Sequence, residues 1–189
     1  MMLVEILIAG FGGQGIISTG QLLAYAGMRA GLHVAWIPSY GPEMRGGTAN
    51  CGVTLSDTEI GSPLVTEPGV LIAMNQPSFD KYAGTVVPRG VILYNSSLAK
   101  DSHGRRDVLM VGVDANRIAE ELGNVQVAAN VVLGAYLGLS GVISVSAAVE
   151  ALEDVLPPHR HRLIPANRAA LERGAAFGVS CREGGSAVG

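Results

Sequence analysis

An apolar segment, a run of glycines and an amphipathic segment open the sequence, and this order constrains the fold more than any other feature. Val4 to Ala9 is a branched apolar run that is typical of a buried strand. From Gln14 to Arg29, apolar residues recur at the spacing of a helix. Between the two, a six-residue turn lacks four Cβ atoms, so its backbone can adopt positive φ and approach a ligand closely. The glycines of this turn are Gly10, Gly12, Gly13 and Gly15.

The start of the predicted helix is suited to an anion. Its first amide groups have no acceptor within the helix and lie at the positive end of the helix dipole, so a phosphate or carboxylate complements them. The spacing Gly10-x-Gly12-x-x-Gly15 also matches the dinucleotide-binding fingerprint. That fingerprint requires an acidic residue at the end of the second strand. The second strand, His33 to Ile37, is followed by no Asp or Glu until Glu43, so an NAD(P) site is disfavoured. Glycines that serve only tight strand–helix packing remain an alternative.

Strands alternate with helices as far as residue 115, and helices alone follow. This pattern predicts the α/β class, a three-layer Rossmann-like fold with a mostly parallel or mixed sheet and a helical C-terminal third. We expect one domain over residues 1–177 and a flexible tail over residues 178–189. The remaining strands are predicted at Thr48–Leu55, Val70–Met74, Val91–Tyr94 and Val108–Val113. The remaining helices are predicted at Ser78–Thr85, Ala115–Leu122, Val127–Leu139, Ser144–Leu156 and Ile164–Ala176.

Four polar or glycine-rich loops follow predicted strands. In parallel sheets, ligands bind outside the carboxyl ends of the strands, so parallel strands would bring these loops together at one edge. The loops are Gly10–Gly15, Pro38–Gly47, Asn75–Ser78 and Asn95–Ser97.

The loop Ser39–Gly47 is the second strong feature. Gly41-Pro42 and Gly46-Gly47 predict two turns, with Glu43 and Arg45 between them. Arg45 can bind a phosphate or carboxylate while Glu43 orients it. An exposed salt bridge and a loop docked into a partner subunit are the alternatives.

Composition indicates a protein that functions in a complex. Only 15% of the residues are charged against 48% hydrophobic, so apolar surface is expected to remain for a partner. The net charge of −3 gives no basic surface for nucleic acid. No stretch is apolar and long enough for a membrane span, so we expect a cytoplasmic protein. Two cysteines cannot hold an iron–sulfur cluster, which takes four.

Other candidate residues are weaker. His159 and His161 have the spacing of a metal-binding pair, but a solvated basic loop is the better interpretation of the segment that includes Arg160 and Arg162. A contact with an anion or a partner is the second interpretation of this segment. Cys51 alternates with apolar residues in a predicted strand, which favours a buried small hydrophobe over a nucleophile. We therefore predict no catalytic residue and no metal ligand in this chain.

Two long motifs give the chain a family resemblance. The segments GFGGQGIISTGQLLAYAG and PSYGPEMRGGTANCGVTLSD together resemble the gamma subunit of 2-oxoacid:ferredoxin oxidoreductases. The resemblance continues through IGSPLV, AMNQPSFDKY and the NSS that ends at residue 97. It is weaker in the helical half, where Asn130, Gly134, Asn167 and Gly174 still fit. The segment GGTANC looks most like the 2-oxoglutarate and branched-chain 2-oxoacid members.

The resemblance implies a non-redox subunit of a larger enzyme. Such enzymes decarboxylate a 2-oxoacid, here 2-oxoglutarate by resemblance, and yield an acyl-coenzyme A and reduced ferredoxin. Thiamine diphosphate and iron–sulfur clusters are expected on partner alpha and beta subunits, and on a delta subunit where one exists. For this chain the resemblance implies assembly surface and coenzyme A binding, with no activity in isolation.

Carried over by position, the implied binding residues fall in the two motifs. The glycine loop supplies Gly10, Gly12, Gly13, Gln14 and Gly15. The second motif supplies Tyr40, Gly41, Glu43, Arg45, Gly46 and Gly47. Two alternatives remain: a purely structural assembly subunit, and a free-standing nucleotide-binding protein of Rossmann type.

Overall fold

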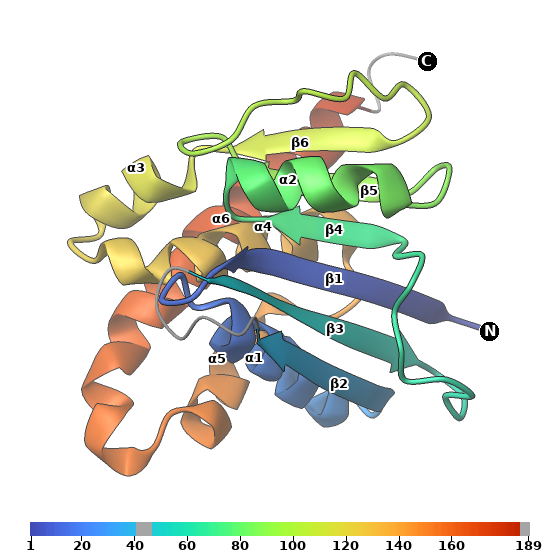
Figure 1. Ribbon diagram of the computed structural model, residues 1–189. Helices are drawn as coiled ribbons and strands as arrows, with labels where there is room; N and C mark the ends of the chain where they lie inside the picture. The colour runs from blue at the N-terminus through green and yellow to red at the C-terminus, as the bar shows by residue number, and fades with distance from the viewer. Residues whose placement is uncertain (41–46, 186–189) are drawn as a thin grey trace.

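A mixed six-stranded sheet forms the centre of the protein. A computed structural model describes residues 1–40 and 47–185. The strand order is β2-β3-β1-β4-β5-β6, and β3 is antiparallel to both of its neighbours, whereas β1, β4, β5 and β6 are parallel (Figure 1). Cys51 of β3 and Ile72 of β4 both pair with Ile8 of the central strand β1. The strands are β1 (Leu3–Phe11), β2 (His33–Tyr40), β3 (Thr48–Ser56), β4 (Val70–Ala73), β5 (Val91–Asn95) and β6 (Leu109–Val113).

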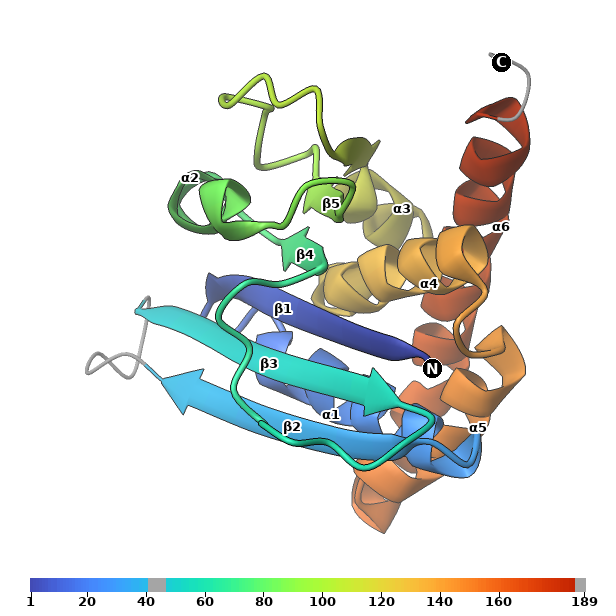
Figure 2. The ribbon, with the colours of Figure 1, turned by 90° about the vertical axis from the view of Figure 1, so that its right-hand side faces the viewer.

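Most of the helical mass covers one face of the sheet. α1, α4, α5 and α6 lie on that face and α2 lies on the other, as the two views of Figures 1 and 2 show. The α-helices are α1 (Ile16–Arg29), α2 (Gln76–Tyr82), α3 (Ala115–Glu121), α4 (Ala128–Ser140), α5 (Val145–Val155) and α6 (Ile164–Gly185). Three short 3-10 helices are η1 (Ala83–Thr85), η2 (Val125–Val127) and η3 (Pro158–Leu163).

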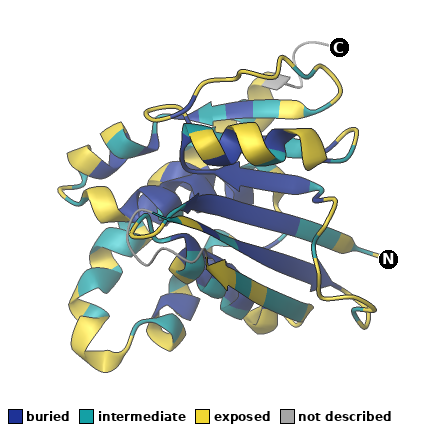
Figure 3. Ribbon diagram, viewed as in Figure 1, coloured by how far each residue is buried: buried dark blue, intermediate teal, exposed yellow. Residues whose placement is uncertain are grey.

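Two hydrophobic cores of unequal size hold these layers together. The larger core joins one face of the sheet to α1, α4, α5 and α6, with Ile8 and Leu23 fully buried in it. The smaller core packs Phe79 of α2 against Leu71 and Ile92 on the opposite face. Figure 3 shows the resulting pattern, with buried central strands and an outer surface of α2 that is exposed.

The backbones of α4 and α6 approach each other closely through glycines. A Cβ on Gly134 of α4 would overlap the carbonyl oxygen of Leu171 in α6, and a Cβ on Gly174 of α6 would overlap that of Val131 in α4. Gly138 and Gly178 repeat this arrangement one helical turn further along each helix. α6 therefore packs on α4 backbone to backbone.

The architecture confirms the predicted fold class, including the helical C-terminal third. The sheet is mixed rather than wholly parallel, because β2 and β3 form an antiparallel pair and β3 lies between β1 and β2. The last helix continues to Gly185, beyond the expected end at Ala176. Part of the segment expected to be a tail is therefore helical, and buried Gly178 packs against the backbone of Ala135.

Candidate functional site

The predicted loops meet at one edge of the sheet. β1, β4, β5 and β6 end at this edge, and the antiparallel β3 begins there (Figure 1). The two sequence motifs are in direct contact, because Phe11 pairs with Thr48 and the amide of Gly12 donates to the carbonyl oxygen of Gly47 at 3.0 Å. The convergence that the sequence predicted is confirmed for the described parts of these loops.

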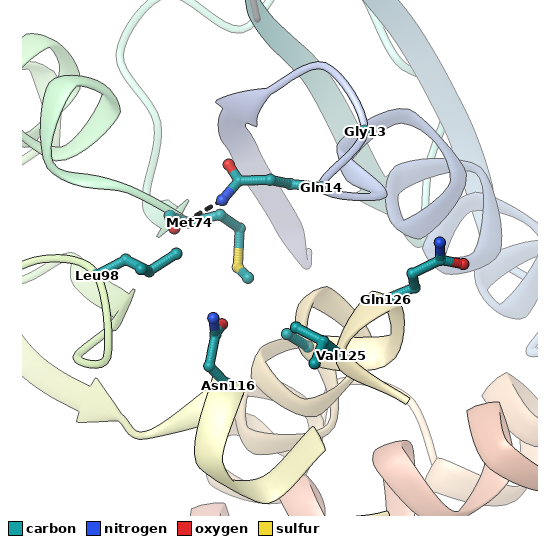
Figure 4. A pocket seen from close by; sticks show the side chains of 8 residues that line it. Gly13, Gln14, Met74, Leu98, Asn116, Val125 and Gln126 are labelled. Atoms are coloured by element: carbon teal, nitrogen blue, oxygen red, sulfur yellow. Dashed lines mark hydrogen bonds between the residues drawn. The ribbon is translucent and has the colours of Figure 1, made fainter. Parts of the chain in front are cut away.

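The side chain of Gln14 fixes the shape of the glycine loop. Its Oε1 accepts a hydrogen bond from the amide of Phe11 at 2.7 Å and another from Nδ2 of Asn75 at 2.9 Å. Its Nε2 donates to the carbonyl oxygen of Met74 at 3.4 Å, the bond drawn in Figure 4. Gln14, predicted as a ligand contact, thus uses its amide group to tie the loop to the end of β4.

Several backbone amides at the start of α1 are available to a ligand. Gly13 and Gly15 have φ of +92° and +80°, and Gly15 caps α1 without a side-chain hydrogen bond. Thr19 is the first helical residue whose amide bonds back to the loop, to the oxygen of Gly15 at 2.8 Å. Within the described part of the chain, no acceptor reaches the amides of Gly13, Gly15, Ile16, Ile17 and Ser18. An anion is the group that such a cluster of donors complements.

A groove of about 500 Å³ runs beside these amides. One wall is the glycine loop with the first turn of α1, and the other consists of η2, the start of α4, η3 and the start of α6. Tyr40, 72% exposed, stands at its end. The polar side chains of the second wall are Asn124, Gln126, Asn130, Arg160 and Asn167.

A chain of hydrogen bonds joins the two walls of the groove. The hydroxyl of buried Thr19 in α1 donates to Oδ1 of Asn130 in α4 at 2.9 Å. Nδ2 of Asn130 donates to Oδ1 of Asn167 in α6 at 2.7 Å, and Nδ2 of Asn167 donates to the oxygen of Leu163 at 2.8 Å. Both asparagine side chains are oriented by these bonds, so the groove is held at a defined width.

Arg160 adds a positive charge to the groove. It lies in η3, is exposed, and forms no salt bridge with any carboxylate among the described residues. An unpaired guanidinium opposite free backbone amides is a suitable arrangement for a phosphate or carboxylate. The sequence favoured a solvated basic loop here over an anion or partner contact, because the position of η3 beside the glycine loop depends on long-range folding.

A second, smaller hollow of about 150 Å³ lies on the other side of the loop (Figure 4). Gly13 and Gln126 line both this hollow and the groove, and Gln14 lines only the hollow. Asn116, at the start of α3, contributes its carboxamide. The apolar lining comes from Met74, Leu98, Val125 and Ala128.

Four of the predicted binding residues lie outside the described residues. They are Gly41, Glu43, Arg45 and Gly46. Of the same motif, Tyr40 and Gly47 are described, and both lie at the glycine-loop edge.

Cys51 is buried, as the sequence predicted, and is unsuited to nucleophilic chemistry. Its side chain packs under α1, where Sγ donates to the oxygen of Ile16 at 3.5 Å, and a Cβ on Gly20 would collide with that sulfur. Burial raises the pKa of the Cys51 thiol to about 12, so it stays protonated at neutral pH. In residues 1–40 and 47–185, no three His, Cys, Asp or Glu side chains gather into a potential metal site.

None of the helices formed by the described residues combines the length and the apolar character needed to cross a bilayer. The fold and the edge site together define an α/β protein whose glycine loop presents unpaired backbone amides. Residues 5–177 match the family described as pyruvate ferredoxin/flavodoxin oxidoreductase, and the chain belongs to this family.

Two relatives are named as subunits of 2-oxoacid oxidoreductases. The chain is 43% identical to ketoisovalerate oxidoreductase subunit VorA of Methanothermobacter thermautotrophicus over 96% of its own length, but it spans only 38% of that relative. It is 37% identical to 2-oxoglutarate synthase subunit KorC of the same organism, over 82% of this chain and 85% of the relative.

Two solved structures share the fold. The gamma subunit of a keto/oxoacid ferredoxin oxidoreductase from Geobacter sulfurreducens superposes with a TM-score of 0.79 at 30% identity, covering 94% of this chain and 99% of that one. A 2-oxoglutarate:ferredoxin oxidoreductase from Magnetococcus marinus, with 2-oxoglutarate, coenzyme A and succinyl-CoA bound, superposes with a TM-score of 0.86 at 25% identity. The match covers 95% of this chain and 32% of that one.

Proposed function

We propose that this chain is the gamma subunit of a 2-oxoacid:ferredoxin oxidoreductase and that it binds coenzyme A for the complex. The observation that carries the proposal is the groove in which the unpaired backbone amides of Gly13 and of Gly15 to Ser18 face Arg160. Coenzyme A carries a diphosphate, and free amides at a helix start together with a guanidinium are suitable donors for it. The coenzyme A bound to the Magnetococcus marinus relative supports the choice of ligand.

In this proposal the chain contributes binding rather than chemistry. The backbone amides hold the diphosphate, Arg160 neutralises part of its charge, and Gln14 positions the loop. The loop residues Glu43 and Arg45 would complete the site. Thiamine diphosphate and iron–sulfur clusters would belong to alpha, beta and delta partners, and ferredoxin would receive the electrons through them.

The substrate would be a 2-oxoacid of branched-chain or 2-oxoglutarate type. The relatives named for ketoisovalerate and for 2-oxoglutarate support these two candidates. Purification of the tagged full-length chain from its own cells tests the assembly and the substrate together. We expect copurifying subunits and 2-oxoacid-dependent, coenzyme A-dependent viologen reduction with one of the two acids. A chain that purifies without other subunits, in an eluate that reduces viologen with neither 2-oxoacid, would contradict this assignment.

Coenzyme A binding is tested separately on the purified complex. Gly13 has φ +92°, and no atom lies within 4 Å of the position of a Cβ there, so Gly13→Val places a branched side chain over the amides and strains the loop. We expect the Michaelis constant for coenzyme A to rise while that for the 2-oxoacid stays unchanged. A normally assembled complex with an unchanged constant for coenzyme A would favour the alternative, a purely structural subunit.

A further inference from the structure

The small hollow beside the glycine loop has apolar walls that no other part of the described chain covers. Leu98, which follows β5, is 46% exposed, and Val125 of η2 is 48% exposed. Met74, only 1% exposed, reaches between them (Figure 4). Two large apolar side chains half exposed around one narrow hollow are suited to the faces of a flat apolar group.

A polar network fixes the orientation of Asn116 at the same hollow. The fully buried Asn95 accepts the amide hydrogen of Ser97 on its Oδ1 at 3.2 Å, so its Nδ2 is the donor to Oδ1 of Asn116 at 2.8 Å. The hydroxyl of Ser97 accepts the backbone amide of Asn116 at 3.1 Å and donates to Asp114 at 2.5 Å. That hydroxyl, followed by the guanidinium of Arg117, lowers the pKa of the Asp114 carboxyl.

This network leaves one group of Asn116 for a ligand. Because Oδ1 of Asn116 is already an acceptor for Asn95, its Nδ2 is an oriented donor, and no acceptor for it lies within the described residues. The side chain of Gln126 across the hollow has no hydrogen-bond partner there either. The hollow thus combines apolar walls with one fixed donor and one adaptable amide.

The hollow is continuous with the proposed diphosphate groove. Gly13 and Gln126 line both spaces, and no atom lies within 4 Å of the position that a Cβ on Gly13 would occupy. A ligand anchored by its diphosphate at the start of α1 can therefore extend past Gly13 into the hollow. A purine base attached through ribose has the required features, namely flat apolar faces and ring nitrogens that accept hydrogen bonds.

We infer that this hollow is a purine-base subsite, in which Leu98, Val125 and Met74 contact the base and Nδ2 of Asn116 donates to a ring nitrogen. The inference rests on the proposed function, because the base is then the adenine of coenzyme A. It assigns base recognition to residues outside both sequence motifs. An apolar side chain of a partner subunit is the competing occupant.

Two variants of the purified complex test the inference. Asn116→Asp keeps the acceptor for Asn95 and replaces the free donor with a carboxylate oxygen, and Leu98→Ser removes an apolar wall. Leu109→Ser is the matched control, because Leu109 is 50% exposed at the start of β6, away from the hollow. The assay measures the Michaelis constants for coenzyme A and for 4′-phosphopantetheine, which lacks the adenosine.

We expect each variant to raise the constant for coenzyme A by roughly 3–10-fold, as for one lost hydrogen bond or apolar contact. The constant for phosphopantetheine and the turnover number should stay at wild-type values, as should every constant of the control. The base subsite would be overturned if the Michaelis constant for coenzyme A were unchanged in both variants. It would also be overturned if the constants for coenzyme A and for phosphopantetheine rose equally. A partner side chain in the hollow would instead appear as weakened assembly with no selective loss of coenzyme A, which overturns it as well.

The same experiment separates failure of the subsite from failure of the proposed function. If Gly13→Val raises the constant for coenzyme A while Asn116→Asp and Leu98→Ser do not, the diphosphate site stands and the base subsite is wrong. If none of the three variants changes that constant, coenzyme A does not bind at this edge and both proposals fail.

Discussion

Replacing Gly174 by alanine should unfold the protein at a lower temperature, because α4 and α6 touch backbone to backbone there. The new Cβ would overlap the carbonyl oxygen of Val131 and would lie 2.9 Å from the amide nitrogen of Ala135. Neither atom belongs to a flexible side chain, so the helices themselves must separate. Gly134 on the facing helix is equally constrained, with its Cβ position 2.9 Å from the carbonyl carbon of Leu171.

The expected magnitude follows from two opposing effects. Overpacking of a close-packed interior costs about 1–3 kcal/mol, and backbone-on-backbone contact favours the upper end of that range. Alanine in place of glycine in a helix stabilises the folded state by about 1 kcal/mol, because alanine has the higher helix propensity. We therefore expect a net loss of roughly 2 kcal/mol, which for a domain of this size lowers Tm by about 4–8 °C.

Gly184→Ala is the control in the same helix. A Cβ on Gly184 would have no neighbour within 4 Å, so this variant gains helix propensity without a clash. Its Tm should equal the wild-type value or exceed it by at most about 4 °C. Thermal unfolding followed by circular dichroism at one protein concentration gives both values. A Gly174→Ala protein as stable as Gly184→Ala would refute the close packing of α4 on α6.

Three further predictions concern the loop, the thiol and the isolated chain. Gln14→Ala should destabilise the protein by about 1–3 kcal/mol in urea titrations, since the amide of Phe11 and Nδ2 of Asn75 lose their acceptor; an unchanged midpoint would contradict its role as a clamp. A thiol reagent should modify Cys181 alone in the native protein, and Cys51 only after unfolding. Because folding raises the pKa of Cys51 to about 12, its contribution to stability is full below the unfolded value of about 8.5 and is lost as pH rises toward 12. The chain on its own should reduce no viologen and should self-associate in light scattering; turnover without partners would overturn the assignment.

Local patterns in the sequence were sufficient to predict the elements and the fold class. The glycine loop, the first helix and the buried state of Cys51 follow from residues that are close in sequence. The position of β3 between β1 and β2 could not be predicted, because it depends on the long-range pairing of β1 with β3, from Phe11 with Thr48 to Leu3 with Ser56. The extension of α6 through Gly178 was missed because glycine has low helix propensity, which packing against Ala135 overrides here.

The residues proposed to bind coenzyme A likewise divide into those that the sequence predicted and those that only the fold revealed. The free amides of the glycine loop could be predicted, because they result from a local strand–loop–helix unit. Arg160 and Asn116 could not be predicted, because they lie more than 100 residues after the glycine loop in the sequence. Folding alone brings them to the same edge of the sheet. The motif indicated Gln14 as a ligand contact. Its role in fixing the loop depends on a hydrogen bond with Asn75, 61 residues away, which the sequence could not predict.

The central claim, that this chain binds coenzyme A for an oxidoreductase complex, is tested most directly by comparing two neighbouring arginines. Arg160 lines the groove, whereas Arg162 lies in the same 3-10 helix and does not. In the purified complex, Arg160→Ala should raise the Michaelis constant for coenzyme A by roughly 10–100-fold, the loss expected for one charged hydrogen bond. The constant for the 2-oxoacid should not change, and Arg162→Ala should match the wild type. Equal constants for coenzyme A in both variants and the wild type would contradict the claim.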